Sequence, residues 1–372
     1  MKFEVIPGLA YVKKVLVDSV QSQHIAHAQL FAGPEGALNL PLALAYATYL
    51  HCENKGNDAC GTCAACSKSL KHIHPDTHFV FPVSKTSTDK DEERVKSEIL
   101  QTWRDFLNAH PFGSLDDWIT HHGGESKKPL ISREESREIV KALSLKPFES
   151  RYKVMIIWQP ELMHPTAANG ILKILEEPAP HTCFILVTNA ADQLLPTILS
   201  RTQIVSIPLL TDEDVKSWLT AQLIDPVKAS MAAHMAAGRL NFAVELTQRE
   251  EDDFAPRFAE WMRACFRKNF ADLVALSEEY HQLDKLSQKN MLQYGMNALR
   301  ESLVHLAGAS SIHRIESEQL SFVKDFSKVL DVPKIERAYG LMNEAGYHLE
   351  RNGSPKMIFM DLSLQLSNVI RT

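Results

Sequence analysis

The sequence contains no apolar run long enough to cross a membrane, and it has no excess of basic residues. Residues 1–5 lack the apolar core of a signal peptide, so we expect a cytoplasmic protein without a membrane segment. The formal net charge is −6 and the pI is near 6.2, whereas free-standing nucleic-acid-binding proteins normally carry a basic excess. Composition therefore argues against that class, although a zinc-dependent nucleic-acid-binding protein stays open as an alternative.

Cysteine is scarce, with six among 372 residues, and four of the six fall in one short stretch. The spacing is Cys52-x7-Cys60-x2-Cys63-x2-Cys66, which in a reducing compartment indicates a metal site rather than disulfides. Four thiolates predict a closed, structural zinc site in a module over residues 52–66. An iron–sulfur cluster and metal-free thiols are the alternatives, but the run lacks the further cysteine and proline of a ferredoxin. Three nearby histidines would be redundant as ligands, and we expect them at the surface or in turns: His51, His72 and His74.

A productive phosphate-binding loop is also missing. Residues 33–40 lie between a predicted strand and a predicted helix, which is where such a loop is found. Gly33 fits the first glycine of G-x-x-x-x-G-K-[ST], but Leu38, Asn39 and Leu40 replace the second glycine, the lysine and the hydroxyl residue. Since the lysine binds the terminal phosphates and the hydroxyl binds magnesium, we expect no productive ATP binding. An active ATPase with an atypical nucleotide site is the alternative.

The strand predicted at residues 154–158 lacks the acidic pair that an ATPase of this layout carries at its end. Gln159 and Pro160 occupy those two positions, and Glu161 comes one residue late. An amide and an imino acid can neither activate water nor serve as hard anionic ligands of magnesium. The loss of the acidic pair is independent of the changes in the phosphate-binding loop. The two losses together predict that the chain does not hydrolyse ATP.

Two charged features near residue 200 are candidates for function. Glu176 and Glu177 could form a paired-carboxylate acid/base site, but Pro178 and an apolar stripe favour a simple helix end. Arg201 follows Ser200 after a short apolar segment and is expected to project from the surface. There it could neutralise charge on the γ-phosphate of a nucleotide held by a neighbouring subunit. An ordinary surface arginine is the alternative.

Several stretches of the sequence resemble the delta-prime subunits of bacterial DNA polymerase III clamp loaders, in the AAA+ superfamily. The matching stretches are residues 27–36, the four-cysteine insert, residues 74–76, residues 168–178 with their Leu-Glu-Glu-Pro ending, and residues 195–201. The resemblance covers most of residues 1–210. It implies an α/β, AAA+-like parallel-sheet domain with a small zinc module, followed by an all-α lid domain and an all-α C-terminal collar bundle. Residues 84–130 have no counterpart and are predicted to be an insertion.

The resemblance also implies a role. The subunit would be catalytically inert, with a structural Zn²⁺ and no productive ATP. Arg201 would act as an arginine finger in trans, supported by Ser200, and Thr202 stands where the family usually has cysteine. Implied partners are the clamp-loader ATPase subunits and the delta subunit in a hetero-pentamer, with the sliding clamp and primed DNA reached through the complex. The chain would thus be part of a DNA polymerase holoenzyme without an ATPase activity of its own.

We expect three domains. Residues 1–208 form the AAA+-like domain, residues 209–248 the helical lid, and residues 249–372 the collar that serves oligomerisation. Beyond residue 208 the apolar spacing is wholly helical, with short loops that are consistent with a bundle.

Overall fold

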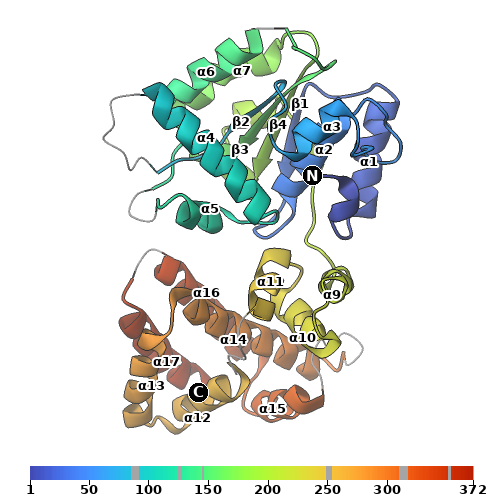
Figure 1. The fold of residues 1–372 in the computed structure, drawn as a ribbon. Coiled ribbons are helices and arrows are strands. Elements are labelled where there is room, and N and C mark those ends of the chain that lie inside the picture. Colours follow the sequence, from blue (N-terminus) through green and yellow to red (C-terminus); the bar gives the residue numbers. More distant parts are fainter. Residues whose placement is uncertain are drawn as a thin grey trace. The chain divides into compact units, whose positions relative to one another are not determined.

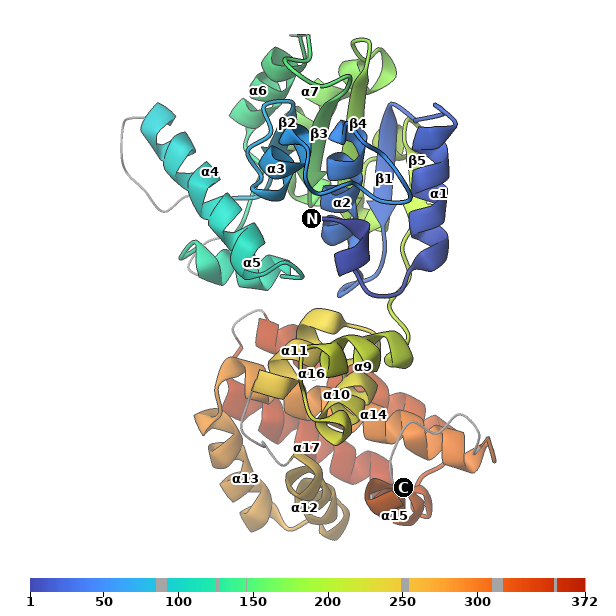
Figure 2. The ribbon, with the colours of Figure 1, turned by 45° about the vertical axis from the view of Figure 1, so that its right-hand side comes forward.

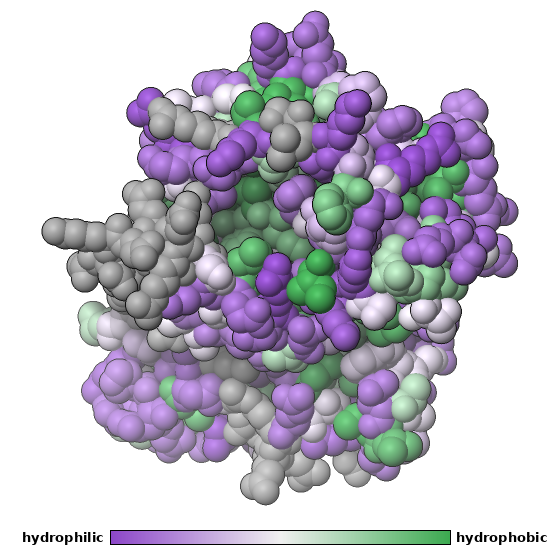
Figure 3. Space-filling model, turned by 45° about the horizontal axis from the view of Figure 1, so that its top comes forward, coloured by the Kyte–Doolittle hydropathy of each residue, from purple (hydrophilic) through white to green (hydrophobic). Residues whose placement is uncertain are grey.

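The computed structural model describes residues 1–84, 92–124, 128–144, 146–248, 254–309, 317–350 and 353–371. These residues form two compact units. Unit 1 contains residues 1–229 and 236–244, and unit 2 contains residues 230–235 and 245–372. Within the described residues, no helix has both the length and the apolar content to cross a bilayer. Figure 3 shows hydrophilic side chains over most of the face in view, with apolar residues in separate patches.

Unit 1 is built on a parallel five-stranded sheet (Figure 1). The strands are β1 (Ala28–Ala32), β2 (Thr77–Val80), β3 (Lys153–Trp158), β4 (Thr182–Thr188) and β5 (Gln203–Ser206), in the order β2-β3-β4-β1-β5. Every residue of β3 and β4 is buried, as expected for strands covered on both faces. The predicted α/β class with a parallel sheet is confirmed.

Helices cover both faces of this sheet (Figure 2). The α-helices of the sheet region are α1 (Ala10–Gln21), α2 (Asn39–His51), α3 (Ala64–Leu70), α4 (Glu92–Ala109), α5 (Leu115–His121), α6 (Arg133–Ser144), α7 (Pro165–Glu176) and α8 (Pro196–Leu199). Three short 3-10 helices are η1 (Phe3–Val5), η2 (Pro160–Leu162) and η3 (Ala191–Gln193). Phe31 packs against Tyr46 of α2, whereas Leu30 joins the core formed with α6, α7 and α8. Alternate residues of one strand thus face opposite helix layers.

The predicted insertion, residues 84–130, is folded onto the sheet where it is described. Trp103 of α4 is stacked on Phe81 at 4.3 Å between ring centroids and lies 5.1 Å from both Trp118 of α5 and Trp158 of β3. The indole nitrogen of Trp118 donates to the carbonyl of Pro82 at 2.7 Å. The sequence pattern of residues 110–129 predicts a loop, and helix α5 (Leu115–His121) corrects that expectation. The rest of the prediction for this insertion, at residues 85–91 and 125–127, lies outside the described residues.

Unit 2 is helical throughout its described residues. Its long helices are α12 (Phe254–Arg267), α13 (Phe270–Gln282), α14 (Lys285–Leu306), α15 (Ser317–Ser327), α16 (Val332–Glu350) and α17 (Pro355–Arg371). Trp261 is fully buried, stacks on Phe359 at 4.6 Å and donates to the hydroxyl of Ser363 at 2.8 Å. This core ties α12 to α17, so the first and last long helices of the unit close one bundle.

Three further helices occupy the predicted lid region. They are α9 (Asp212–Ala221), α10 (Pro226–Ala236) and α11 (Leu240–Gln248). Residues 226–229 and 236 of α10 belong to unit 1, and residues 230–235 belong to unit 2. The helices themselves agree with the sequence pattern, while the division into three domains at residues 208 and 248 stays a prediction.

Candidate functional site

Four cysteine sulfurs meet at the end of α2. Cys52 follows the last residue of α2, Cys63 is the N-cap of α3, and Cys66 lies in the first turn of α3. With Cys60, their Sγ atoms all lie within 4.8 Å of one another, and all are free thiols. The Sγ atoms of Cys60 and Cys66 are 3.9 Å apart, close to the roughly 3.8 Å of a tetrahedron with Zn–S distances of about 2.3 Å. The four predicted ligands are therefore brought together, and the donor set fits zinc.

Backbone N–H groups surround these sulfurs. The N–H of Cys60 donates to the Sγ of Cys52 at 3.2 Å, and the N–H groups of Cys63 and Cys66 each donate to the sulfur three residues earlier at 3.4 Å. Backbone hydrogen bonds lower the pKa of Cys60 to about 6, whereas burial raises the pKa values of Cys52 and Cys66. Since metal ligands bind as thiolates, the lowered pKa of Cys60 favours its ligand form, whereas Cys52 and Cys66 deprotonate less readily.

The same module holds the N-terminal segment. The carboxylate of Asp58 accepts the backbone N–H groups of Phe3 at 3.1 Å and Glu4 at 2.9 Å. The loop between Cys52 and Cys60 is therefore bonded to η1 at the start of the chain. These contacts fit a module that connects elements of the fold.

The three neighbouring histidines are buried, which corrects the expectation of surface positions. His51, His72 and His74 are 4%, 7% and 3% exposed, although His72 does lie in a turn. His51 shares hydrogen bonds with Ser150 at 2.7 Å and Thr77 at 2.8 Å and stacks on His74 at 3.9 Å. Burial lowers the pKa values of His51 and His72 to about 3, so both rings are neutral at pH 7.

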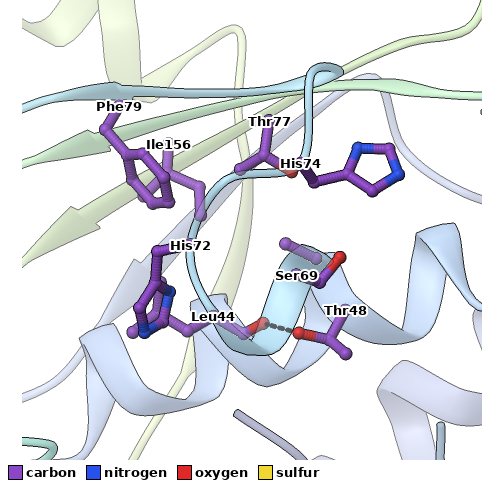
Figure 4. Close-up of a pocket in the computed structure, with 9 residues that line it drawn as sticks. Leu44, Thr48, Ser69, His72, His74, Thr77, Phe79 and Ile156 are labelled. Carbon is purple, nitrogen blue, oxygen red and sulfur yellow. Dashed lines mark hydrogen bonds between the residues drawn. The ribbon is translucent and has the colours of Figure 1, made fainter. Parts of the chain in front are cut away.

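A small cavity lies beside these rings (Figure 4). Its lining comes from α2, α3, β2, β3 and the turn between α3 and β2: Leu44, Ala47, Thr48, Ser69, His72, His74, Thr77, Phe79 and Ile156. The space is about 10 Å³, which holds about one water molecule. It is too small for a nucleotide, so His72 and His74 are part of the core that packs the four-cysteine module against the sheet.

The turn between β1 and α2 is tied down by side chains of the chain itself. Asn39 is 1% exposed, and its Nδ2 donates to the carbonyl of Thr188 at 2.8 Å. Gly36 has a φ of 83°, and a Cβ there would lie 2.3 Å from the Cγ of Arg239. The amide of Asn39 thus bonds the end of β4, and the side chain of Arg239 contacts the turn. Neither contact supplies the lysine and hydroxyl chemistry that bound phosphates and magnesium need.

An amide bridge joins this turn to the end of β3. Gln159 adopts left-handed backbone angles (φ 57°, ψ 56°), and its Nε2 donates to the Oδ1 of Asn189 at 3.0 Å. The Nδ2 of Asn189 in turn donates to the carbonyl of Pro34 at 2.9 Å. Pro160 begins η2, and Glu161 is bonded to the end of β4, where burial raises the pKa of its carboxyl group. The two positions of the missing acidic pair therefore hold an amide in a structural network and a helix-starting proline.

Arg201 lies just beyond α8, after Ser200. Its Nε and Nη2 donate to one carboxylate oxygen of Glu176, at 3.1 and 2.9 Å, and its Nη1 donates to the carbonyl of Thr197 at 3.1 Å. The side chain of Arg201 is 31% exposed and that of Glu176 is 60% exposed. The hydroxyl of Ser200 donates to the same carbonyl of Thr197 at 3.2 Å. The arginine is thus ordered within the chain and still reaches solvent.

Comparison with known proteins decides the family. A family model described as "DNA polymerase III, delta subunit" matches residues 9–211, more than half of the chain. A DNA polymerase III subunit delta' of Bacillus subtilis is 27% identical over 271 residues, which is 73% of this chain. The chain belongs to the delta-prime family of DNA polymerase III. The resemblance seen in the sequence is confirmed.

Another curated relative and a solved structure are also similar to this chain. The subunit delta' of Haemophilus influenzae is 25% identical over 60% of this chain. The chain spans 64% of the length of the Bacillus relative and 55% of the Haemophilus relative. The solved structure of a gamma subunit-related protein of Thermotoga maritima covers 96% of this chain and 100% of its own, at 14% identity and a TM-score of 0.41. At that score the structural likeness carries no argument about the fold.

Two residues at the turn of this delta-prime family member were given no role from the sequence. Asn189 and Arg239 contact the turn from 155 residues and about 200 residues further along the chain. Local spacing holds no signal for contacts of that range. Asn189 follows a predicted buried strand, and Gly238 before Arg239 ends a predicted helix. The position of each polar residue directly after a predicted strand or helix was the feature of the sequence that could have indicated its role.

Proposed function

We propose that the chain is a catalytically inert subunit of a DNA polymerase III clamp loader. In this role it supports ATP-driven loading of the sliding clamp onto primed DNA and donates Arg201 in trans to a neighbouring ATPase subunit. Membership of the delta-prime family supports the assembly, because relatives carry the names of DNA polymerase III subunits delta' and gamma/tau. The hetero-pentamer with the ATPase subunits and the delta subunit, and a cytoplasmic location, are parts of the same proposal.

The proposed lack of ATPase activity is supported by the contacts of the residues that stand where an ATPase has its catalytic groups. The amide of Asn39 donates to the carbonyl of Thr188 at the end of β4, and the amide of Gln159 donates to Asn189. A nucleotide would have to displace bonds that hold the ends of the strands together, with no lysine or acidic pair to compensate. These contacts favour the inert subunit over an active ATPase with an atypical site.

Arg201 is the residue through which the chain would promote ATP hydrolysis by a neighbouring subunit. Ser200 and Arg201 follow α8 at a partly exposed end of unit 1, where the guanidinium keeps N–H groups available to a neighbour. A guanidinium at a neighbour's γ-phosphate stabilises charge that develops in the transition state. What the chain does there is present a fixed positive charge. It holds no reacting group itself.

The metal centre has a structural part in this proposal. Cys52, Cys60, Cys63 and Cys66 would hold Zn²⁺ as four thiolates and leave no position for water or substrate. When bound, the ion supplies cross-linking of the loop and no reaction step. The hydrogen bonds from the N–H groups of Phe3 and Glu4 to Asp58 support this role, because the loop that the ion would cross-link is bonded to the N-terminal segment.

Two measurements test the assembly and the inertness. The purified chain, mixed with the ATPase subunits of its own organism, is expected to co-elute with them in size-exclusion chromatography. Equilibrium titration of the isolated chain with fluorescent ATP and magnesium is expected to show no saturable binding up to millimolar concentration, and the purified ATPase subunit serves as the positive control. Saturable binding with hydrolysis by the isolated chain would establish the active-ATPase alternative instead.

A further inference from the structure

Glu176 lies at a helix end where an acid is electrostatically unfavourable. It is the last residue of α7, and the helix stops before Pro178. The C-terminal end of a helix carries partial negative charge and favours cations. Glu176 therefore does not stabilise its own helix by charge, and its contacts must be sought elsewhere. The only ion pair of its side chain within the described residues is with Arg201, 25 residues further along the chain.

The geometry of that pair leaves part of the arginine free. A guanidinium has five N–H groups in one plane. Glu176 accepts from Nε and from one Nη2 hydrogen, and Thr197 accepts from one Nη1 hydrogen. One hydrogen remains on Nη2, and the second hydrogen of Nη1 is available only to a long, 3.5 Å hydrogen bond to the hydroxyl of Ser200. The two terminal nitrogens are therefore the part of the guanidinium that can bind two phosphate oxygens, once the long hydrogen bond to Ser200 is displaced.

We propose that Glu176 is a positioning residue for Arg201. It fixes one edge of the guanidinium, so that the opposite end is presented to the terminal phosphate of a nucleotide on a neighbouring subunit. This inference rests on the proposed role of Arg201. Without Glu176, the arginine keeps its charge but samples other rotamers, so fewer encounters place it correctly as charge develops.

The pair contributes little to folding. Both side chains are substantially exposed, 31% for Arg201 and 60% for Glu176, and exposed ion pairs have small effects on stability. Replacing Glu176 should therefore leave assembly and melting temperature essentially unchanged. Glu177 provides a matched control, because it is the adjacent exposed glutamate and its side chain makes no hydrogen bond within the described residues.

The test compares five complexes that carry the wild-type chain, Glu176→Ala, Glu177→Ala, Arg201→Ala, or Glu176→Ala with Arg201→Ala. Each is assembled with the ATPase and delta subunits, and assembly is checked by size-exclusion chromatography. ATP hydrolysis stimulated by the sliding clamp and primed DNA is measured over a range of ATP concentrations. We expect Glu176→Ala to lower kcat by about tenfold with little change in KM, because misplacement of a transition-state contact lowers kcat. Glu177→Ala should match the wild type.

The double variant separates positioning from any other role. If Glu176 acts through Arg201, its replacement has no further effect once Arg201 is alanine. A Glu176→Ala complex with the wild-type rate, beside a slow Arg201→Ala complex, overturns the positioning role and leaves the proposed function intact. A faster Glu176→Ala complex overturns it as well, since Glu176 would then restrain the arginine. A wild-type rate for Arg201→Ala overturns the proposed function, and the positioning role with it.

Discussion

At the scale of single residues, the chain uses polar side chains at the nucleotide position for its own structure. Asn39, Gln159 and Asn189 form bonds that connect the β1–α2 turn to the ends of β3 and β4. The residue types at these positions predicted a loss of ATP chemistry, because they lack the lysine, the hydroxyl and the acidic pair. The sequence could not predict the network, since the partners are 30 to 155 residues apart and only the folded sheet brings them together.

The burial of the three histidines could not be predicted from the sequence for the same reason. His51 is bonded to Ser150 and Thr77, 99 and 26 residues away. Their proximity to the cysteines in sequence suggested a surface loop. Their burial is a consequence of how α2, α3 and β2 pack, and no local pattern encodes it.

His72 predicts a pH dependence of stability. Burial, the N-terminus and Arg104 lower its pKa from 6.5 to about 3, so between pH 3 and 6.5 the unfolded chain binds more protons than the folded chain. The stability from its neutral ring is therefore complete above pH 6.5 and is lost as the pH falls towards 3. From pH 7.5 to 5 this amounts to about 2 kcal/mol.

The measurement compares urea unfolding of the wild type with that of His72→Asn. Asparagine tolerates the left-handed backbone at this position (φ 56°) and does not titrate. We expect the wild type to lose about 2 kcal/mol more than the variant between pH 7.5 and 5. Parallel pH profiles for the two proteins would show that His72 is protonated in the folded chain.

At the scale of elements, long segments with apolar periodicity were predicted correctly, whereas two short elements, β5 and α5, were not. The strand predicted at residues 28–32 and the helix starting at Asn39 agree with β1 and α2. Strand β5 was missed because its four residues are largely exposed and it forms a sheet edge. Helix α5 was missed because its seven residues lie between glycines, and its Ser114–Asp117 capping box was not recognised. Elements this short depend on tertiary contacts such as the burial of Trp118.

The four-cysteine element gives a prediction about metal. The purified chain should contain about one zinc per molecule and no iron, because four thiolates at this spacing close a tetrahedral site. Cys60→Ser should reduce the zinc content to well below one and lower the melting temperature. A chelator should lower the melting temperature of the wild type but have little further effect on Cys60→Ser.

Cys183→Ala is the control for the loss of a cysteine, since Cys183 is buried in β4 outside the cluster. It should keep about one zinc per chain, even if the lost packing reduces its stability. Iron in the wild type, or full zinc content in Cys60→Ser, would contradict the four-thiolate zinc site.

At the scale of the whole molecule, the sequence was sufficient to predict the protein family, but not the packing of the helices of unit 2 or the division into two units. The family model matches residues 9–211, which contain the sheet, the cysteines and Arg201. The helices of unit 2 were predicted from apolar spacing, while their packing around Trp261 and Phe359 required the structure. The contacts group the described residues into two units, and α10 contributes to both. Boundaries predicted from apolar spacing at residues 208 and 248 carry no information about such sharing.

The central claim is that this chain contributes an arginine to a nucleotide it does not hold. The direct measurement is the clamp- and DNA-stimulated ATP hydrolysis rate of the assembled complex at saturating ATP, with Arg201→Ala against the wild type. Arg151→Ala, which removes another exposed arginine of unit 1, is the control. We expect Arg201→Ala to lower the rate, by up to about 10³-fold if every turnover passes through the site that this chain contacts, and Arg151→Ala to leave it unchanged. A fully assembled Arg201→Ala complex that hydrolyses ATP at the wild-type rate would contradict the account.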